Sequence, residues 1–385
     1  MNSRERLLTA INREIPDRLP VTSHFVMPYF LNNYMGGISE NEFWDATGMD
    51  PILWTISHIP DPSKGEYFDP SQKEIAFLES RRISSDNWRI ESFPIDDPDN
   101  NITRYNFITP DRTLTMVLSA NDTTAWVVEP LIKEKNDIDI LAKYMTYPNC
   151  NVAEINQQAK EWGDRGIVRG WICCFDVFGQ PGTWQDACCL AGIERMIMET
   201  YDDPAWVHEL LGILFERKKT YIKSLKGAKY DIHELGGGSA SDTVISPNIF
   251  DEFVAPYDGE LIKLAHEAGQ RISYHTCGGM MSMIPHILQM EPDAMETLTP
   301  PGMGGNTDIK KAKRLLKDKV CMIGGFDQFH FLKDCTPEET RAEVRRIFRD
   351  AGEGGGYILC PSDNYFDADP ELLLAFADEA RKCVY

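Results

Sequence analysis

Short runs of apolar and β-branched residues alternate along the chain with longer segments of helical periodicity. Such runs predict buried strands, because a strand that is covered on both faces is apolar at nearly every position. Eight strands are predicted, at residues 19–24, 52–57, 167–174, 231–235, 271–275, 294–298, 320–324 and 357–361. Eight strands that alternate with helices predict an α/β fold of the (β/α)8 TIM-barrel type.

The helices between these strands are marked by their first residues. A side chain that can cap a helix precedes a proline at Asp203-Pro204, Ser246-Pro247, Thr336-Pro337 and Asp369-Pro370. Thr336 is followed three residues later by Glu339, which completes a capping box. Helical spacing also predicts one buried stripe, made of Trp206, Leu210, Leu211, Leu214 and Tyr221.

Residues 60–130 interrupt this alternation between the second and third predicted strands. Here Tyr105 and Phe107 alternate with polar neighbours, and Pro110-Asp111 predicts a turn before the next apolar run. This pattern predicts an antiparallel β-hairpin insertion that covers one end of the barrel. No repeat or linker divides the chain, so residues 1–385 are predicted to form a single domain.

Composition and charge narrow the class of protein. Hydrophobic residues make up 42% of the chain and charged residues 26%, as in soluble globular enzymes. The formal net charge of −21 argues against nucleic acid and anionic membranes as partners. The ten cysteines include no CxxC pair, and the first residues lack an apolar signal segment. We therefore expect a cytoplasmic protein in which most thiols act as small hydrophobes.

Chemically active residues gather where the predicted strands end. These residues are Ser23, His24, Ser57, His58, Cys173, Cys174, Glu234, His275, Cys277, Glu296, Asp327, Gln328, Cys360 and Asp363. In TIM barrels the carboxyl ends of the strands carry the active site. The pattern therefore predicts one polar site on this face of the barrel.

His275 and Cys277 stand two residues apart at the end of a predicted strand, so their side chains point to the same face. Nitrogen and sulfur together suit Zn²⁺, although an isolated pair of this kind is equally compatible with a buried histidine beside a small apolar cysteine. The position at a strand end favours the metal. We predict a three-ligand zinc site of His275, Cys277 and Cys360 with an open fourth position, as in catalytic zinc centres. Glu234 is a candidate fourth ligand, supporting residue or substrate contact.

The same residues belong to longer motifs of a known family. The start of the chain, Arg4-Glu5-Arg6-Leu7-Leu8 with Pro16-Asp17-Arg18-Leu19-Pro20-Val21, resembles that of the uroporphyrinogen decarboxylase superfamily. Further similar segments are Ile245-Ser246-Pro247, Phe253-Val254-Ala255-Pro256-Tyr257, Gly324-Gly325-Phe326-Asp327-Gln328 and Gly355-Gly356-Tyr357-Ile358-Leu359. His275-Thr276-Cys277-Gly278-Gly279 resembles the zinc motif of that superfamily's corrinoid-dependent methyltransferases. The resemblance implies a TIM barrel of the uroporphyrinogen decarboxylase-like type.

The resemblance implies one of two activities. The decarboxylases bind a macrocycle with eight carboxylates through N-terminal arginines, whereas residues 21–25 here are Val-Thr-Ser-His-Phe and the chain is acidic. The methyltransferases hold Zn²⁺ and work with cobalamin carried on a separate corrinoid protein. We expect a zinc-dependent methyltransferase that moves a methyl group between this partner and a thiol or a small methylated substrate, such as a methoxyaromatic. The direction of transfer stays open.

Two alternatives remain. One is a uroporphyrinogen decarboxylase-like lyase without metal. The other is a corrinoid- or tetrapyrrole-binding module that is not an enzyme, which would leave the metal-ligand residues without a purpose.

The third zinc ligand departs from the family pattern. In the methyltransferase branch the distant cysteine lies nearer to the position of Asp363 than to that of Cys360. Either Cys360 takes over this role or Asp363 supplies an oxygen ligand, since zinc accepts both. We choose Cys360 because it completes a thiolate-rich site.

The remaining candidate residues have roles in catalysis or in substrate binding. Asp363 and Asp327 are candidate catalytic carboxylates. His24, Gln328 and Tyr29 are candidate substrate contacts, and Tyr29 belongs to an aromatic-rich segment.

Overall fold

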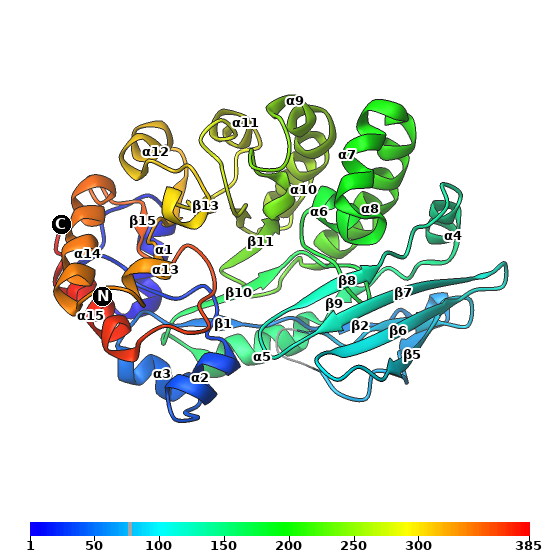
Figure 1. Cartoon of the computed structure of the whole chain (residues 1–385), viewed down its shortest axis with the longest axis horizontal. Helices are drawn as coiled ribbons and strands as arrows, with labels where there is room; N and C mark the ends of the chain where they lie inside the picture. The colour runs from blue at the N-terminus through cyan, green and yellow to red at the C-terminus, as the bar shows by residue number, and fades with distance from the viewer. Residues whose placement is uncertain (76–78) are drawn as a thin grey trace.

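A curled parallel sheet forms the centre of the molecule (Figure 1). The computed structural model describes residues 1–75 and 79–385. Seven strands follow the order β1-β10-β11-β12-β13-β14-β15, and each pairs in parallel with the next. Their bounds are β1 Ile52–Trp54, β10 Ile167–Trp171, β11 Ile232–Gly236, β12 Ile272–His275, β13 Ala294–Thr297, β14 Cys321–Gly324 and β15 Tyr357–Ile358. Seven of the eight predicted strands are therefore confirmed.

The predicted strand at residues 19–24 forms only a one-residue bridge. Val21 pairs in parallel with Leu359, and its carbonyl accepts a hydrogen bond from the backbone N–H of Asp50. Pro20 has no N–H, and the Val21 N–H donates to the Asp50 carboxylate, so a regular ladder toward β1 does not form. This segment nevertheless links the two edges of the sheet, which is consistent with a TIM-barrel-like fold.

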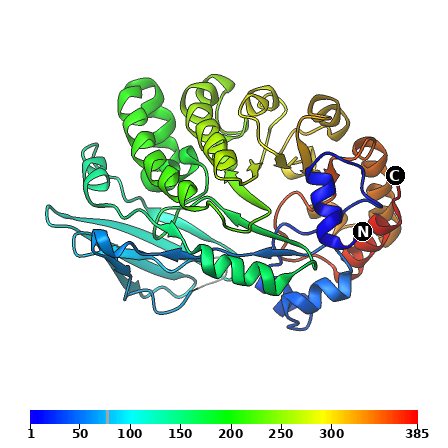
Figure 2. The ribbon, with the colours of Figure 1, turned by 180° about the vertical axis from the view of Figure 1, so that it is seen from behind.

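Helices succeed one another in an arc around the outside of the sheet (Figures 1 and 2). Their bounds are α1 Ser3–Ile11, α2 Pro28–Tyr34, α3 Glu40–Thr47, α4 Asp137–Tyr144, α5 Val152–Trp162, α6 Thr183–Ala191, α7 Ile193–Asp202, α8 Pro204–Ser224, α9 Pro247–Ile249, α10 Ala255–Glu267, α11 Ile284–Gln289, α12 Ile309–Leu316, α13 Gln328–Phe331, α14 Pro337–Ala351 and α15 Pro370–Lys382. A π-helix, Phe250–Val254, joins α9 to α10, and short 3₁₀ turns lie at Pro62–Lys64, Gly238–Ala240 and Pro301–Met303.

The predicted helix starts are confirmed. Asp203, Ser246, Thr336 and Asp369 each accept a backbone N–H from the first turn of the helix that follows. Thr336 and Glu339 form the complete capping box. Such caps each stabilise a helix by about 1 kcal/mol, because they satisfy N–H groups that the helix leaves unpaired.

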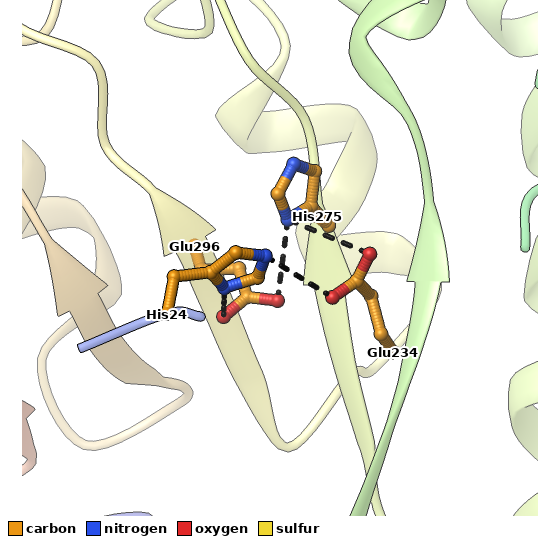
Figure 3. Close-up of side chains that lie close together, drawn as sticks. All are labelled: His24, Glu234, His275 and Glu296. Atoms are coloured by element: carbon orange, nitrogen blue, oxygen red, sulfur yellow. Dashed lines mark ion pairs between the residues drawn. The ribbon is translucent and has the colours of Figure 1, made fainter. Parts of the chain in front are cut away.

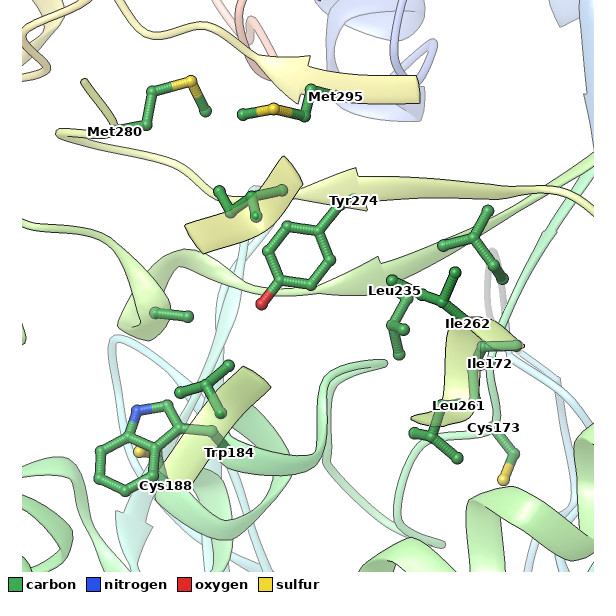
Figure 4. Close-up of a cluster of buried hydrophobic side chains, with 14 of the residues drawn as sticks. Ile172, Cys173, Trp184, Cys188, Leu235, Leu261, Ile262, Tyr274, Met280 and Met295 are labelled. Atoms are coloured by element: carbon green, nitrogen blue, oxygen red, sulfur yellow. The ribbon is translucent and has the colours of Figure 1, made fainter. Parts of the chain in front are cut away.

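A large apolar cluster fills the space between the sheet and these helices, and Figure 4 shows part of it. The predicted stripe of α8 belongs to this cluster. Tyr274 is buried here on β12, and its hydroxyl donates to Asp258 of α10 at 3.2 Å. Burial of a side chain of this size contributes about 2 kcal/mol, so the cluster holds β11 and β12 rigidly beneath the site.

An antiparallel sheet lies to one side of the parallel sheet (Figure 1). It contains β5 Arg89–Ile95, β6 Asn101–Ile108, β7 Thr113–Ala120 and β8 Ala125–Glu129, and shorter antiparallel pairs join β2 His58–Ile59 to β9 Asn149–Cys150 and β3 Glu66–Phe68 to β4 Ile83–Ser85. Phe107 of β6 packs against Trp88 and Phe175, and the Trp88 indole donates to Asp176 at 3.0 Å. The antiparallel sheet is thereby attached to the loop that follows β10.

Within the described ranges, no helix is both long enough and apolar enough to cross a membrane.

Candidate active site

Four buried side chains converge at the carboxyl end of the parallel sheet (Figure 3). Glu234, His275 and Glu296 stand on the neighbouring strands β11, β12 and β13, and His24 follows the Val21 bridge. One ligand atom from each of the four lies within 4.8 Å of the others. His275 and Glu296 are paired positions in the β12–β13 register, so the strand alignment itself sets them side by side.

Arg169 of β10 holds the two carboxylates of this cluster. Its guanidinium donates to Glu234 at 2.9 Å and also to Glu296, and it lies over the ring of Trp54. Burial raises the pKa of Glu296, but the charge of Arg169 and the hydrogen bond with His275 outweigh burial and hold that pKa well below its ordinary value. The sequence places Glu296 among the strand-end residues of this site without a specific role, and it does not predict Arg169 there.

His275 uses its two ring nitrogens for different neighbours. Nδ1 lies 3.4 Å from Glu296 and 3.8 Å from Glu234, whereas Nε2 lies 3.0 Å from the Sγ atom of Cys277. Figure 3 shows the second nitrogen pointing away from both carboxylates. Burial lowers the pKa of His275, but the interactions with Cys277 and Glu234 raise it by a larger amount. The pKa of His275 therefore lies well above its ordinary value. The carboxylates thus orient the ring with Nε2 toward the thiol.

Cys277 links His275 to Asp363. The thiol donates to the Oδ2 atom of Asp363 at 3.0 Å, and the Oδ1 atom of that carboxylate accepts the backbone N–H of Asn364. Burial raises the pKa of Cys277 to about 11; His275 opposes this shift and Asp363 adds to it. Cys277 Sγ thus lies 3.0 Å from a nitrogen donor on one side and 3.0 Å from an oxygen donor on the other, and the spacing of His275 and Cys277 predicted the first of these contacts.

The loop that carries Cys277 is held by hydroxyl groups of neighbouring loops. The backbone N–H of Gly278 donates to Thr299 at 3.2 Å, and that of Gly279 donates to Thr243 at 2.7 Å. A Cβ atom at Gly279 would lie 1.7 Å from the Asp242 carboxylate, so any other residue there would displace that side chain. The glycines of the motif therefore allow the close packing that fixes the thiol.

The donor set around Cys277 fits a zinc ion. Zinc binds imidazole, thiolate and carboxylate together, and three protein ligands leave a position for a substrate. The cluster of His24, Glu234, His275 and Glu296 fits a cation less well, because Arg169 already occupies both of its carboxylates. Glu234 and Glu296 instead lie behind Nδ1 of His275, where carboxylates commonly support a zinc-bound histidine.

Cys360 has mainly apolar neighbours, although the charges of Glu296, Arg169 and Asp363 are near enough to affect its pKa. It is buried in a small apolar cluster with Ile52, Ile167, Ile232 and other aliphatic residues, and burial raises its pKa far above the ordinary value. Its role as the third ligand stays a prediction.

The other predicted site residues have structural contacts. Gln328 is buried and accepts the backbone N–H of Ser362, which helps to place the loop that carries Asp363. Asp327 caps α13 by accepting the N–H of His330. Tyr29 lies on α2 and lines a surface pocket with the turns that follow β5 and β7. Catalytic or substrate roles for these three residues stay predictions.

A cavity of about 430 Å³ is lined by His275 and Asp363, the two residues on either side of Cys277. Its walls include Phe25, Trp171 and Phe178, and His24, Glu234, His275 and Asp363 lie at its polar end. Thr124 and Ala125, at the start of β8, belong to the same wall. No lysine or arginine is present among the described residues that line it. The cavity therefore offers a small molecule both aromatic and polar surface, without a cationic side chain.

The fold and the motifs together define a protein class. Residues 179–383 match the family model described as uroporphyrinogen decarboxylase (URO-D), and the chain belongs to this family. The family predicted from the sequence motifs is thus confirmed.

Similar proteins include two kinds of enzyme. A uroporphyrinogen decarboxylase of Thioalkalivibrio sulfidiphilus is 27% identical over 191 residues, which cover 47% of this chain and 50% of that protein. A methylated-thiol–coenzyme M methyltransferase of Methanosarcina mazei is 25% identical over 156 residues, or 40% of each chain. The chain thus spans half or less of the length of these relatives.

A solved structure extends the likeness to the whole fold. A methyltransferase from Methanosarcina mazei superposes with a TM-score of 0.59 at 13% identity, covering 99% of this chain and 98% of that one. At this identity the likeness shows a shared fold.

Proposed function

We propose that this protein is a zinc-dependent methyltransferase that moves a methyl group between a small molecule and the corrinoid of a separate protein. One observation carries the proposal: Cys277 Sγ lies 3.0 Å from both His275 Nε2 and Asp363 Oδ2, beside a cavity with aromatic walls. The similarity to a methyltransferase that acts on methylated thiols supports it.

In this proposal His275, Cys277 and Asp363 hold the zinc. When bound, zinc supplies a Lewis acid that polarises the heteroatom of a methylated substrate or stabilises a thiolate. The apolar surroundings of Cys360 favour Asp363 as the third ligand, in place of the cysteine chosen from the sequence. Glu234 then supports the site from behind His275 and is not itself a ligand.

The chain's own residues prepare this site for the reaction. Glu296 and Glu234 lie on the Nδ1 side of His275, so that Nε2 faces Cys277 and is the ring atom that would bind the metal. Arg169 keeps Glu296 ionised in a buried environment. The aromatic walls exclude water and hold the body of the substrate, so that its reacting atom lies near Cys277.

A separate partner must carry the methyl group. The proposed carrier is a corrinoid protein that brings cobalamin to the carboxyl end of the sheet, where the cavity opens. A thiol or a methoxyaromatic compound fits the cavity by size and polarity. The cytoplasmic location and the absence of nucleic-acid and membrane partners stay predictions.

A decarboxylase-like activity without metal is the second candidate. The URO-D family match and the relatives named uroporphyrinogen decarboxylase favour it. A polycarboxylate substrate would, however, need cationic groups, and those described residues that line the cavity include neither lysine nor arginine.

Two measurements on the full chain test the proposal. Elemental analysis of protein purified without chelators should find about one zinc per chain, since such donor sets retain the metal. Reduced corrinoid protein, mixed with this chain and a methylated donor, should change its absorption spectrum from Co(I) to methyl-Co(III). Absence of zinc together with decarboxylation of a porphyrinogen would replace the proposal by the second candidate.

A further inference from the structure

A pocket lined mainly by cationic side chains lies between α12 and α14, two helices that stand next to each other on the outside of the sheet (Figure 1). It has a volume of about 340 Å³. The residues that line it are Lys310, Lys313, Arg314, Lys317, Arg349, Asp350 and Glu353. Five cations and two carboxylates therefore share one space in a chain whose formal net charge is −21. We call this space the basic pocket.

Four of the cations form a stripe along α12. They are spaced three, four and seven residues from the first, which places them on one side of the helix: Lys310, Lys313, Arg314 and Lys317. Lys310, Arg314 and Lys317 are exposed, and within the described ranges none of them forms an ion pair. The neighbouring Lys311, outside the stripe, pairs with Asp308 at 3.3 Å. The stripe therefore gathers cations that lack a counter-ion in the fold.

Lys313 adds a buried charge to the wall of the basic pocket. It is 7% exposed, and its ammonium donates to the carbonyl oxygen of Gly355. Burial lowers the pKa of Lys313, and the charge of Lys317 adds to this shift. Asp318 and Glu353 oppose the shift without cancelling it. An anion in the basic pocket would therefore stabilise this buried charge.

The lining of the basic pocket suits phosphate oxygens. Asp350 already accepts a hydrogen bond from Arg346 at 3.0 Å, and Glu353 is exposed. The guanidinium groups of Arg314 and Arg349 can each bind two oxygens of a phosphate, and the lysines supply further charge. A phosphate ester carries about −1.5 to −2 charge at pH 7, so a diphosphate concentrates more charge in a small volume than a carboxylate-rich peptide does.

The basic pocket lies apart from the candidate active site. Lys317 and Gly355 precede β14 and β15, at the amino ends of these strands, whereas His275 and Asp363 lie at the carboxyl end of the sheet. We propose that the basic pocket binds a small molecule that carries a diphosphate group. None of the residues that line it belongs to the proposed zinc site, so binding there is independent of methyl transfer.

Calorimetric titration of the full chain with pyrophosphate, at about 0.1 M salt, tests this proposal. Wild-type protein should bind about one pyrophosphate per chain, and orthophosphate more weakly, because the smaller anion reaches fewer cations. The double variant Arg314→Gln/Lys317→Gln should bind pyrophosphate at least about tenfold more weakly, since it loses two charged hydrogen-bond donors. Both side chains are exposed, so the fold should stay intact.

The matched control is Lys226→Gln/Lys229→Gln. This variant removes two exposed lysines that precede β11 and do not line the basic pocket, so its affinity for pyrophosphate should be unchanged. Asp363→Ala should also keep the affinity, because Asp363 lies at the other end of the sheet.

Four results would each overturn the inference. They are undetectable binding by wild-type protein, the same affinity in the two double variants, loss of binding in Asp363→Ala alone, and tighter binding of hexaglutamate than of pyrophosphate. The third result would place the anion at the zinc site. The fourth would identify an acidic protein segment as the occupant of the basic pocket.

Discussion

The thiol of Cys277 lies 3.0 Å from the carboxylate of Asp363, although 86 positions separate the two residues in the chain. One residue follows β12, and the other follows β15. Together with His275, the last residue of β12, they form the proposed metal-ligand set at the carboxyl end of the parallel sheet.

Zinc affinity should depend on Asp363 and not on Cys360. Cys277→Ala and Asp363→Ala should each weaken zinc binding more than tenfold, because each removes a donor atom. Cys360→Ala should keep the metal and lose about 1 kcal/mol of stability, because the thiol is packed among aliphatic side chains. Competition with a chromophoric chelator measures all three. If Cys360→Ala loses zinc and Asp363→Ala keeps it, Cys360 is the third ligand.

Arg169→Met should destabilise the protein strongly. The change leaves Glu234 and Glu296 buried without their cation, and removal of one partner from a buried ion pair typically costs about 3–5 kcal/mol. Urea denaturation at pH 7 measures the loss. The triple variant Arg169→Met/Glu234→Gln/Glu296→Gln should recover part of it, because no buried charge is then left unmatched. Equal stability of Arg169→Met and wild-type protein contradicts the prediction.

The stability of the fold should fall on acidification partly through His58. Its pKa is lowered to about 3 in the folded protein, against an ordinary value of about 6.5. The unfolded chain therefore takes up a proton below pH 6.5 that the folded chain takes up only near pH 3, so stability decreases as the pH falls between these values. From pH 7 to pH 5, wild-type protein should lose about 2 kcal/mol more than His58→Gln. Equal losses in denaturant titrations at the two pH values would show that His58 is not held neutral.

Ligand affinity should depend on the first residue of β8. Ala125→Phe places a ring in the wall of the cavity beside His275 and Asp363 and should weaken binding of a methoxyaromatic probe, 4-methoxyphenol, about tenfold, with zinc content unchanged. Val128→Phe is the matched control, since Val128 is exposed on the same strand and does not line this cavity. If both variants bind the probe with the same affinity, β8 does not contribute to the binding site.

Much of the fold is predictable because buried parallel strands are apolar at nearly every position. The run around β12 and the capped starts of α8 and α14 are examples. The segment at Val21 has the same apolar character but forms one bridge only. Its neighbour Pro20 lacks a donor, and Asp50 takes the Val21 N–H with a side chain that no periodicity reveals.

The site is predictable where it depends on strand geometry. His275 and Cys277 meet because residues two apart share a face. Cys360 and Asp363 cannot be distinguished in this way, because the choice depends on how the loop after β15 turns, and Gln328 sets that turn from another segment. Arg169 left a usable signal: it is a lone charge within the apolar run Ile167-Val168-Arg169-Gly170-Trp171. Such a charge needs a buried counter-ion, and the carboxylates of Glu234 and Glu296 supply it.

Ala125 lines the cavity but belongs to a different sheet from the residues proposed to bind the metal. His275 ends a strand of the parallel sheet, and Cys277 and Asp363 follow strands of that sheet, whereas part of the cavity wall belongs to a sheet inserted between β1 and β10. A change in the turn before β8 therefore alters the shape of the cavity and leaves the proposed metal ligands in place. Such a change can be a substitution, a deletion or an exchange of the whole turn. An ancestral chain of this kind could acquire a new substrate preference through changes in its insertion alone. A laboratory library of variants confined to residues 121–125 tests this possibility.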